Sequence, residues 1–520
     1  MRFAWIMPLL LLFGCGKGFT PKSTTGANTF TTVYTSMPTS LDPSDSQDVN
    51  TNDFLSQVYE GLTAWGEDNK LAPNLARSWE ILDGGTRYRF HLQSGVKFSS
   101  GKSLSAHDVK WSWERSADSI WGSPLALNYL GDIMGVKEKL AGKAKEISGL
   151  KVIDDLTLDV RIDKPRAYFL GKLSYPTTFI MASNSVADRE RVEKIEKMAG
   201  TGAFVVSTFD PDQTIKLVPN PNSRVTTLLE SWTIRIVKDP ATRLNLFKTG
   251  GIDVLALSQQ DVAGVQASGQ TILKADRAAT VYIGMNGTVY KPFADPRVRR
   301  AFMMAVDRQF ILDKILMGVG RIADGILPPA VPMAPRVKPT PTYDPEGARK
   351  LLREAGWQGK LPPVELWVNN ANNDRKTIAE YVVGQLAKNL GVDAKLRLAE
   401  SGLIITKATK RELGFYYGSW YADYLDPENF LSVLLADYGQ NRSNYDNPLF
   451  SSLTRRADGE INPAKRVGLY AMAEDLALTD CPIMPLYHPQ ESIVVRDGVT
   501  GLRQNAFGFL PPVTVKVTRE

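Results

Sequence analysis

Cysteine and histidine are scarce in this chain. The 520 residues contain two cysteines, Cys15 and Cys481, which exclude a disulfide framework and any CxxC metal site. The three histidines, His91, His107 and His488, are far apart in the sequence and show no metal-ligand spacing. We therefore expect no metal site and no cofactor, and we expect Cys481 to be a small buried thiol.

Long hydrophobic runs and a large net charge are also lacking. No apolar stretch of about 20 residues is present, which excludes a polytopic membrane protein. The net charge of +6 is small for a chain of this length, so we expect no nucleic-acid partner. Hydrophobic residues (43%) and charged residues (23%) are near globular averages, which excludes a disordered or fibrous chain.

The N-terminus carries a secretion signal. Arg2 precedes an apolar stretch, residues 3–13, that is too short to span a bilayer but typical of a signal peptide. It ends in Leu12-Phe13-Gly14-Cys15, which resembles a bacterial lipobox, so we expect cleavage after residue 14 and lipidation of Cys15. An ordinary signal peptide cut nearby is the alternative. Residues 15–28, rich in Gly, Thr, Ser and Lys, predict a flexible tether.

Asp-Pro pairs mark helix starts in the body, because Asp caps the helix and Pro fits its first position. Such pairs predict helices after Asp239, after Asp344, and from Asp295 to about Met317. Alternating or apolar runs predict strands beside them, at residues 232–237, 252–257, 364–368 and 394–398, with a further helix at residues 375–390. These segments form two α/β units of β-α-β type, at residues 232–257 and 364–398.

Two α/β units leave a cleft between them, and ligands bind at strand carboxyl ends in such folds. The region from residue 60 to about 180 has a different pattern. Turns at residues 83–85 and 99–101, strands near residues 88–92 and 156–161, and a helix at residues 106–116 predict a separate α+β insertion.

One pattern favours an enzyme. Ser94-Gly-Val-Lys97 fits Ser-x-x-Lys and Lys248-Thr-Gly250 fits Lys-Thr-Gly, as in serine acyl-transferases of the penicillin-binding type. That chemistry needs the serine at a helix start, whereas Ser94 follows a predicted strand and Lys248 ends a predicted helix. We therefore predict no enzyme activity.

A series of motifs runs in one order along most of the chain. They are Leu41-Asp42-Pro43, Val58-Tyr59-Glu60-Gly61-Leu62, Leu71-Ala72-Pro73-Asn74-Leu75-Ala76, Gly200-Thr201-Gly202-Ala203-Phe204, Asp295-Pro296-Arg297-Val298-Arg299 and Trp420-Tyr421-Ala422-Asp423. In this order, over residues 30–490, the sequence resembles bacterial extracellular solute-binding proteins of family 5, the oligopeptide/dipeptide class of ABC transporters.

The resemblance implies an α/β periplasmic-binding-protein fold of type II (cluster C), with two α/β lobes around a ligand cleft and an extra α+β domain. The domains expected are a signal peptide (1–14), a tether (15–28), lobe I (29–60, 181–282 and 490–520), the extra domain (61–180) and lobe II (283–489).

The resemblance also implies the ligand contacts. Asp423 would pair with the α-ammonium group of a peptide, since a closed cleft strips that cation of water; a turn cap near Asp426 is the alternative role. Trp420 and Tyr421 would line the same pocket or be core aromatics. Val49, Tyr282, Asn441 and Arg375 fall where relatives contact the ligand.

By this resemblance the chain is expected to be a lipid-anchored peptide receptor of the periplasm, or of the outer face of the cytoplasmic membrane. A monomer would deliver its peptide to the permease and ATPase subunits of an ABC importer. Nickel chelates, murein peptides, glutathione and sugars are alternative cargoes in this broad family.

Overall fold

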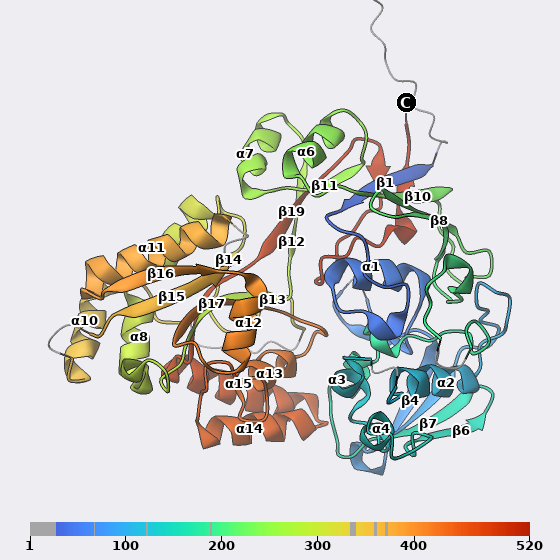
Figure 1. The fold of residues 1–520 in the computed structure, drawn as a ribbon, viewed down its shortest axis with the longest axis horizontal. Coiled ribbons are helices and arrows are strands. Elements are labelled where there is room, and N and C mark those ends of the chain that lie inside the picture. The colour runs from blue at the N-terminus through green and yellow to red at the C-terminus, as the bar shows by residue number, and fades with distance from the viewer. Residues whose placement is uncertain are drawn as a thin grey trace, which may run out of the picture.

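The computed structural model describes residues 28–66, 68–120, 123–187, 190–332, 340–357, 361–369 and 373–519. The predicted signal peptide, Cys15 and nearly all of the tether lie outside these residues. Two bodies stand side by side in Figure 1. The right-hand body holds lobe I above and the extra domain below, and the left-hand body is lobe II.

Lobe I is built on two small sheets and a separate two-stranded sheet of β20 and β21. The first has the order β1-β10-β9-β8, with β1 parallel to β10 and the other pairs antiparallel. The second is antiparallel, with the order β11-β19-β12. The strands are β1 (Thr29–Tyr34), β8 (Phe204–Asp210), β9 (Thr214–Pro219), β10 (Ser231–Ile236), β11 (Val254–Ala256), β12 (Ile272–Asp276), β19 (Gln490–Val495), β20 (Val499–Thr500) and β21 (Lys516–Val517). The helices are α1 (Val49–Val58), α6 (Pro240–Lys248) and α7 (Gln259–Ala267).

The extra domain has a four-stranded antiparallel sheet covered by short helices, and a separate two-stranded sheet of β2 and β3. Its strands have the order β4-β5-β7-β6, and α2 packs on them with Trp113 fully buried. Its strands are β2 (Thr63–Trp65), β3 (Leu71–Pro73), β4 (Ala76–Leu82), β5 (Arg87–Leu92), β6 (Leu150–Asp154) and β7 (Thr157–Arg161). Its helices are α2 (Ala106–Ser116), α3 (Ala126–Leu130), α4 (Val136–Leu140) and α5 (Phe169–Lys172). This sheet and the helices on it enclose a separate hydrophobic cluster, to which Ala182 and Ala199 also belong.

Lobe II is a six-stranded mixed sheet with helices on both faces. Its order is β14-β18-β13-β17-β15-β16, antiparallel except for the parallel contacts of β15 with β16 and β17. The strands are β13 (Ala279–Met285), β14 (Arg321–Ile322), β15 (Val364–Asn369), β16 (Ala394–Ala399), β17 (Phe415–Tyr421) and β18 (Ile483–His488). The helices are α8 (Pro296–Met304), α9 (Arg308–Phe310), α10 (Pro345–Glu354), α11 (Asn373–Leu390), α12 (Ser401–Thr409), α13 (Leu431–Leu435), α14 (Pro448–Gly459) and α15 (Pro463–Asp480).

The Asp-Pro signals are confirmed as helix starts. The carboxylates of Asp239, Asp295 and Asp344 accept hydrogen bonds from backbone N–H groups in the first turns of α6, α8 and α10. The predicted unit at residues 364–398 is also confirmed, since β15 and β16 are parallel neighbours joined by α11.

Two local predictions are wrong. The helix expected from residue 295 to about 317 ends at Met304, because Asp307 caps a new helical segment, α9, by accepting from the Phe310 N–H. The strands β10 and β11, predicted as one β-α-β unit, lie in different sheets. The edge strand β1 comes between them, since the Asp253 N–H donates to the Thr31 carbonyl at 2.8 Å.

Two chain crossings join lobe I to lobe II. The chain passes from β12 to β13 at residues 276–279 and returns from β18 to β19 at residues 488–490 (Figure 1). The Arg277 N–H donates to the Pro489 carbonyl at 3.0 Å, so the two crossings are bonded to each other. The predicted boundary at residue 282 falls inside β13, which belongs wholly to the sheet of lobe II.

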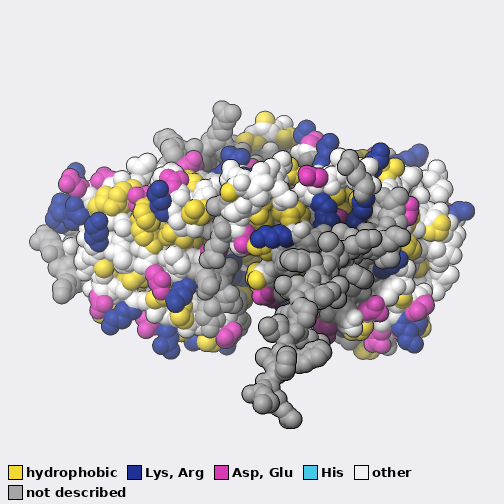
Figure 2. Space-filling model, turned by 90° about the horizontal axis from the view of Figure 1, so that it is seen from above, with side chains coloured by type: hydrophobic (Ala, Val, Ile, Leu, Met, Phe, Trp, Pro, Cys, Tyr) yellow, Lys and Arg dark blue, Asp and Glu magenta, His cyan; other side chains and the backbone are white. Residues whose placement is uncertain are grey.

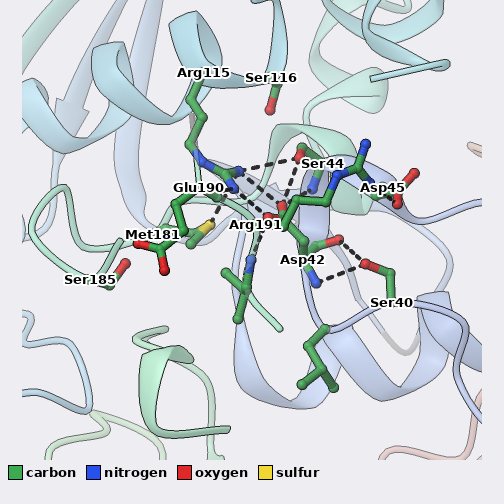
Figure 3. A network of polar contacts seen from close by, with 12 residues as sticks. Ser40, Asp42, Ser44, Asp45, Arg115, Ser116, Met181, Ser185, Glu190 and Arg191 are labelled. Atoms are coloured by element: carbon green, nitrogen blue, oxygen red, sulfur yellow. Dashed lines mark hydrogen bonds and ion pairs between the residues drawn. The ribbon is translucent and has the colours of Figure 1, made fainter. Parts of the chain in front are cut away.

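A buried ion pair fixes lobe I to the extra domain. The Asp42 carboxylate accepts from Arg115 of α2 at 2.9 Å and from the Val192 N–H at 3.1 Å (Figure 3). It also accepts from the N–H and hydroxyl groups of Ser44, at 3.0 and 2.7 Å. The side chains of Asp42 and Arg115 are 1% and 6% exposed, so the two charges of this junction are buried and paired with each other.

The surface carries charges of both signs. On the upper face, shown in Figure 2, basic and acidic side chains are interspersed and do not gather into one field. Within the described ranges, no helix combines the length and the apolar character that a membrane crossing needs.

Candidate functional site

A cavity of about 370 Å³ lies where lobe I, the extra domain and lobe II meet. Lobe I contributes Val49 and Asn52 of α1, and the extra domain contributes Trp65 and Tyr175. Lobe II contributes residues 421–423, at the end of β17. This volume falls in the range of small-molecule sites, about 300–1,000 Å³.

Three side chains with formal charge line the cavity: Glu60, Arg277 and Asp423. Glu60 pairs with Arg224 at 2.8 Å, and Arg277 pairs with Glu491 at 2.5 Å. In the part of the chain that the structure describes, no Lys or Arg nitrogen forms an ion pair with the Asp423 carboxylate. The cavity therefore holds one acidic group without a counter-charge.

The position of Asp423 follows from the end of strand β17. Beyond this strand, the Ala422 N–H donates to the Ala278 carbonyl at 2.8 Å, and the Asp423 N–H donates to the amide oxygen of Asn429 at 3.0 Å. These bonds fix the backbone of Asp423, which lines the cavity. The turn after it is capped by Asp426, which accepts from the Glu428 N–H.

Burial raises the pKa of Asp423 to about 6, and the hydrogen bond from the Tyr129 hydroxyl opposes this shift in part. Desolvation penalises the charged form, and no cation in the described residues compensates for it. A carboxyl with this pKa is mostly ionised at pH 7 and gains from any cation that enters the cavity.

A second cavity of about 260 Å³ also reaches Asp423. It lies between the extra domain and lobe II, and its walls include Tyr129, Lys172, Trp420 and Glu428. Burial, and next the nearby Asp458, raise the pKa of Glu428 above its ordinary value. Asp423 is thus shared between a mainly apolar and a polar compartment.

The structure brings four of the predicted contacts together. Val49, Tyr421 and Asp423 line the larger cavity, and Trp420 lines the smaller one with Asp423. Val49 and Tyr421 are 57% and 44% exposed, as expected of residues that face an open cavity. Trp420 also donates from its indole nitrogen to Asn429 at 3.2 Å.

The other three lie elsewhere. Tyr282 is buried in lobe II, where its ring packs against Gly418 and edge-on against Tyr416. The side chain of Asn441 is bonded at both ends to the backbone of Tyr445, at 2.7 and 2.8 Å. Arg375 lies on α11, where its guanidinium is 3.3 Å from the Ser419 hydroxyl and 5.9 Å from the centre of the Tyr417 ring.

Several lining residues were not predicted from the sequence. Arg277 lies at the first crossing, and Phe507 and Phe509 come from the C-terminal segment. In the extra domain the rings of Tyr129 and Tyr175 stack 3.9 Å apart. No local pattern marks these residues, because each reaches the cavity only through the folding together of distant segments.

The residues of the predicted acyl-transferase motifs do not form a site. Ser94 lies in a turn after β5, and Lys248 is the last residue of α6. In Figure 1, α6 is at the top of the molecule and the sheet of the extra domain is at the bottom. Within the described residues, no group of three or more His, Cys, Asp or Glu side chains is arranged to hold a metal ion.

Known proteins are similar to this chain in architecture and in sequence. The model of the bacterial extracellular solute-binding proteins, family 5 Middle, matches residues 70–442, and the chain belongs to this family. The fold agrees: the MppA periplasmic murein tripeptide binding protein, in its unliganded open form, superposes with a TM-score of 0.82 at 24% identity. That match covers 95% of this chain and 98% of the other.

Two curated relatives cover nearly the whole chain. The probable deoxycholate-binding periplasmic protein YgiS of Escherichia coli (strain K12) is 30% identical over 472 residues, which is 87% of this chain and 86% of YgiS. The periplasmic oligopeptide-binding protein OppA of the same organism is 28% identical over 477 residues, which is 89% of this chain and 87% of OppA.

Proposed function

We propose that this protein captures short peptides with a free amino terminus in the larger cavity and delivers them to the permease and ATPase subunits of an ABC importer. The observation that carries the proposal is the Asp423 carboxylate, which lines the cavity without a cationic partner among the described residues. The relative OppA, by its name an oligopeptide-binding protein, supports a peptide as the cargo.

The physical reason is electrostatic. A peptide ammonium that enters the cavity loses water, and a carboxylate at hydrogen-bond distance compensates for that loss. The ammonium group would in turn be a cationic partner for Asp423, as Arg115 is for Asp42 at the other junction. Each group thus offsets the desolvation of the other.

We also propose where the protein is located in the cell and in what form it acts. Lipidation at Cys15 would anchor the protein to a membrane, in the periplasm or at the outer face of the cytoplasmic membrane. The protein would act as a monomer. The receptor would work without catalysis and without a cofactor, because delivery needs only capture and release. The periplasmic relatives YgiS and OppA support this location.

The test is calorimetric titration of tri-alanine and N-acetyl tri-alanine into the wild-type protein and Asp423→Asn. Losing one partner of a buried charge pair costs about 2–5 kcal/mol, so either change alone should weaken binding at least about 30-fold. The two changes together should cost little more than one, since both remove the same contact.

The matched control is Asp437→Asn, at an exposed aspartate paired with Arg455 outside the cavity, which should bind like wild type. Equal affinity of the wild-type protein for the free and acetylated peptides would refute the proposal.

An amphipathic non-peptide cargo is the second candidate. Aromatic side chains such as Trp65, Phe179 and Phe507 line the cavity, and the relative YgiS is named as a probable deoxycholate-binding protein. Deoxycholate carries a carboxylate, which Asp423 would repel. If this acid is the cargo, Asp423→Asn should strengthen its binding, the opposite of the effect expected for a peptide.

A further inference from the structure

The C-terminal segment forms a compact loop, residues 504–509, on the wall of the larger cavity. The side-chain oxygen of Asn505 accepts from the backbone N–H groups of Phe507 and Phe509, both at 3.0 Å. The Gly508 N–H donates to the Asn505 carbonyl at 2.9 Å. These bonds close the loop, and Asn505, Phe507 and Phe509 line the cavity.

Arg277 connects this loop to the two chain crossings between lobe I and lobe II. Its guanidinium donates to the Phe507 carbonyl and pairs with Glu491, which lies just beyond the second crossing. Gly508 packs against the same guanidinium, since a Cβ atom at Gly508 would lie 2.0 Å from Nη1 of Arg277. The backbone of Gly508 also has a φ of 85°, which disfavours other residues.

The neighbouring residue, Ala278, ties the loop to the ammonium site. Its N–H donates to the Ala506 carbonyl and its carbonyl accepts from the Ala422 N–H, both at 2.8 Å. The Arg277 guanidinium also lies 5.5 Å from the centre of the Tyr421 ring. Residues 277–278 therefore hold the loop on one side and the segment that carries Asp423 on the other.

The chemistry of the loop indicates what it contacts. Glu60 and Arg277 are neutralised by partners, so the cavity offers one unpaired charge, Asp423, to the amine. The loop adds two aromatic rings, whose centres are 6.0 Å apart. The part of the ligand that faces the loop gains from being apolar, because burial of apolar surface is favourable there and a second charge has no counter-ion.

We propose that loop 504–509 is the specificity-determining wall of the cavity, that it selects peptides with an apolar side chain, and that Arg277 is the residue that positions it. This inference rests on the proposed function and names the class of peptide. Residues 277 and 278, which hold the loop, belong to the first chain crossing between the lobes.

The experiment measures selectivity, not affinity alone. Tri-alanine peptides that carry Phe or Ser at position 1, 2 or 3 are titrated into the wild-type protein, Arg277→Met, Phe507→Ala and Gly508→Ala. Arg321→Met is the control, because Arg321 pairs with Asp276 at the same crossing, at 2.8 Å, but does not line the cavity.

We expect the wild type to bind the Phe peptide at least about tenfold more tightly than the Ser peptide at one of the three positions, the effect of burying an aromatic side chain. In Arg277→Met, Phe507→Ala and Gly508→Ala this ratio should fall about fivefold or more. In Arg321→Met it should stay unchanged, and all variants should still discriminate against N-acetylated peptides, because Asp423 is intact.

Two results would overturn the inference: a wild-type ratio near one at all three positions, or an unchanged ratio in the loop variants. Either result with intact discrimination against acetylated peptides would leave the proposed function standing. Phe507→Ala shortens one half-buried side chain of the loop and leaves the contacts of Arg277 with the backbone of residues 507 and 508 in place, so it decides the outcome even if Arg277→Met does not fold. Arg277→Lys, which keeps the charge without the forked geometry, should give an intermediate ratio if the role is positioning.

Discussion

Two aspartates at junctions between parts of this molecule behave in opposite ways. Asp42, between lobe I and the extra domain, pairs with Arg115 and accepts from backbone and hydroxyl donors, which lowers its pKa although burial opposes this. Asp423, where lobe II meets the other two parts, has a pKa raised to about 6 by burial. The comparison teaches that the partner, more than burial, decides whether a carboxylate stabilises the fold.

The difference matches the two junctions. The Asp42 junction is closed by the chain's own charges, so it joins lobe I and the extra domain into one body. The Asp423 junction has a cavity on either side and its charge is not compensated by a described cation. Under the proposed function, the ligand supplies there what Arg115 supplies to Asp42.

The largest effect should come from breaking the closed junction. Arg115→Met leaves Asp42 buried without its cation, which should lower the free energy of unfolding by about 3–5 kcal/mol. Urea denaturation followed by circular dichroism measures this loss. The double variant Asp42→Asn/Arg115→Met should recover part of it, and a loss below about 1 kcal/mol in the single variant would contradict this account.

A smaller effect of opposite sign is expected at the open junction. The pKa of Asp423 is higher in the folded chain than in the unfolded chain, so the folded state binds more protons between about pH 4 and 6 and stability falls as the pH rises through that range. Asp423→Asn removes this cost and should raise the unfolding free energy of the ligand-free protein at pH 7 by up to about 3 kcal/mol.

Urea denaturation at pH 7 and pH 4 tests this prediction, since the gain should vanish at the lower pH, where the carboxyl is protonated in the folded state. A destabilised Asp423→Asn variant at pH 7 would mean that Asp423 has a structural partner like that of Asp42.

The smallest change in unfolding free energy is expected from an ion pair at the surface, which serves as a reference for the two junctions. Arg455 and Asp437 pair at 2.8 Å with both side chains 52% exposed. Water and salt screen such a pair, so Arg455→Met should change the unfolding free energy by less than about 0.5 kcal/mol in the same assay. A loss as large as that of Arg115→Met would mean that pairing alone, without burial, sets the stability.

Much of the fold could be predicted because its signals are local. The Asp-Pro caps located α6, α8 and α10, and alternating or apolar runs located β15 and β16. The errors came where distant segments decide the outcome. The edge strand β1 separates β10 from β11, although it is some 200 residues away in sequence.

The site divides in the same way. A short motif led to Asp423 and Tyr421, which line the cavity. Tyr282 and Asn441 lie in regions that resemble ligand contacts, but their side chains pack in the core or close a local turn. Arg277 carries no motif, and its importance depends on its contact with Phe507, 230 residues further along the chain.

The two ends of the described chain meet in lobe I (Figure 1). The Val517 N–H donates to the side chain of Asn28 at 2.9 Å, and the Arg519 guanidinium donates to the Asp253 carboxylate at 3.1 Å. A tag attached near either end would therefore be fixed to lobe I. Lobe II would be connected to it through lobe I and the crossings at residues 277 and 489. If the protein is immobilised through either end, lobe II should remain free to move relative to lobe I. Lobe II is therefore the natural place for a reporter dye in a sensor.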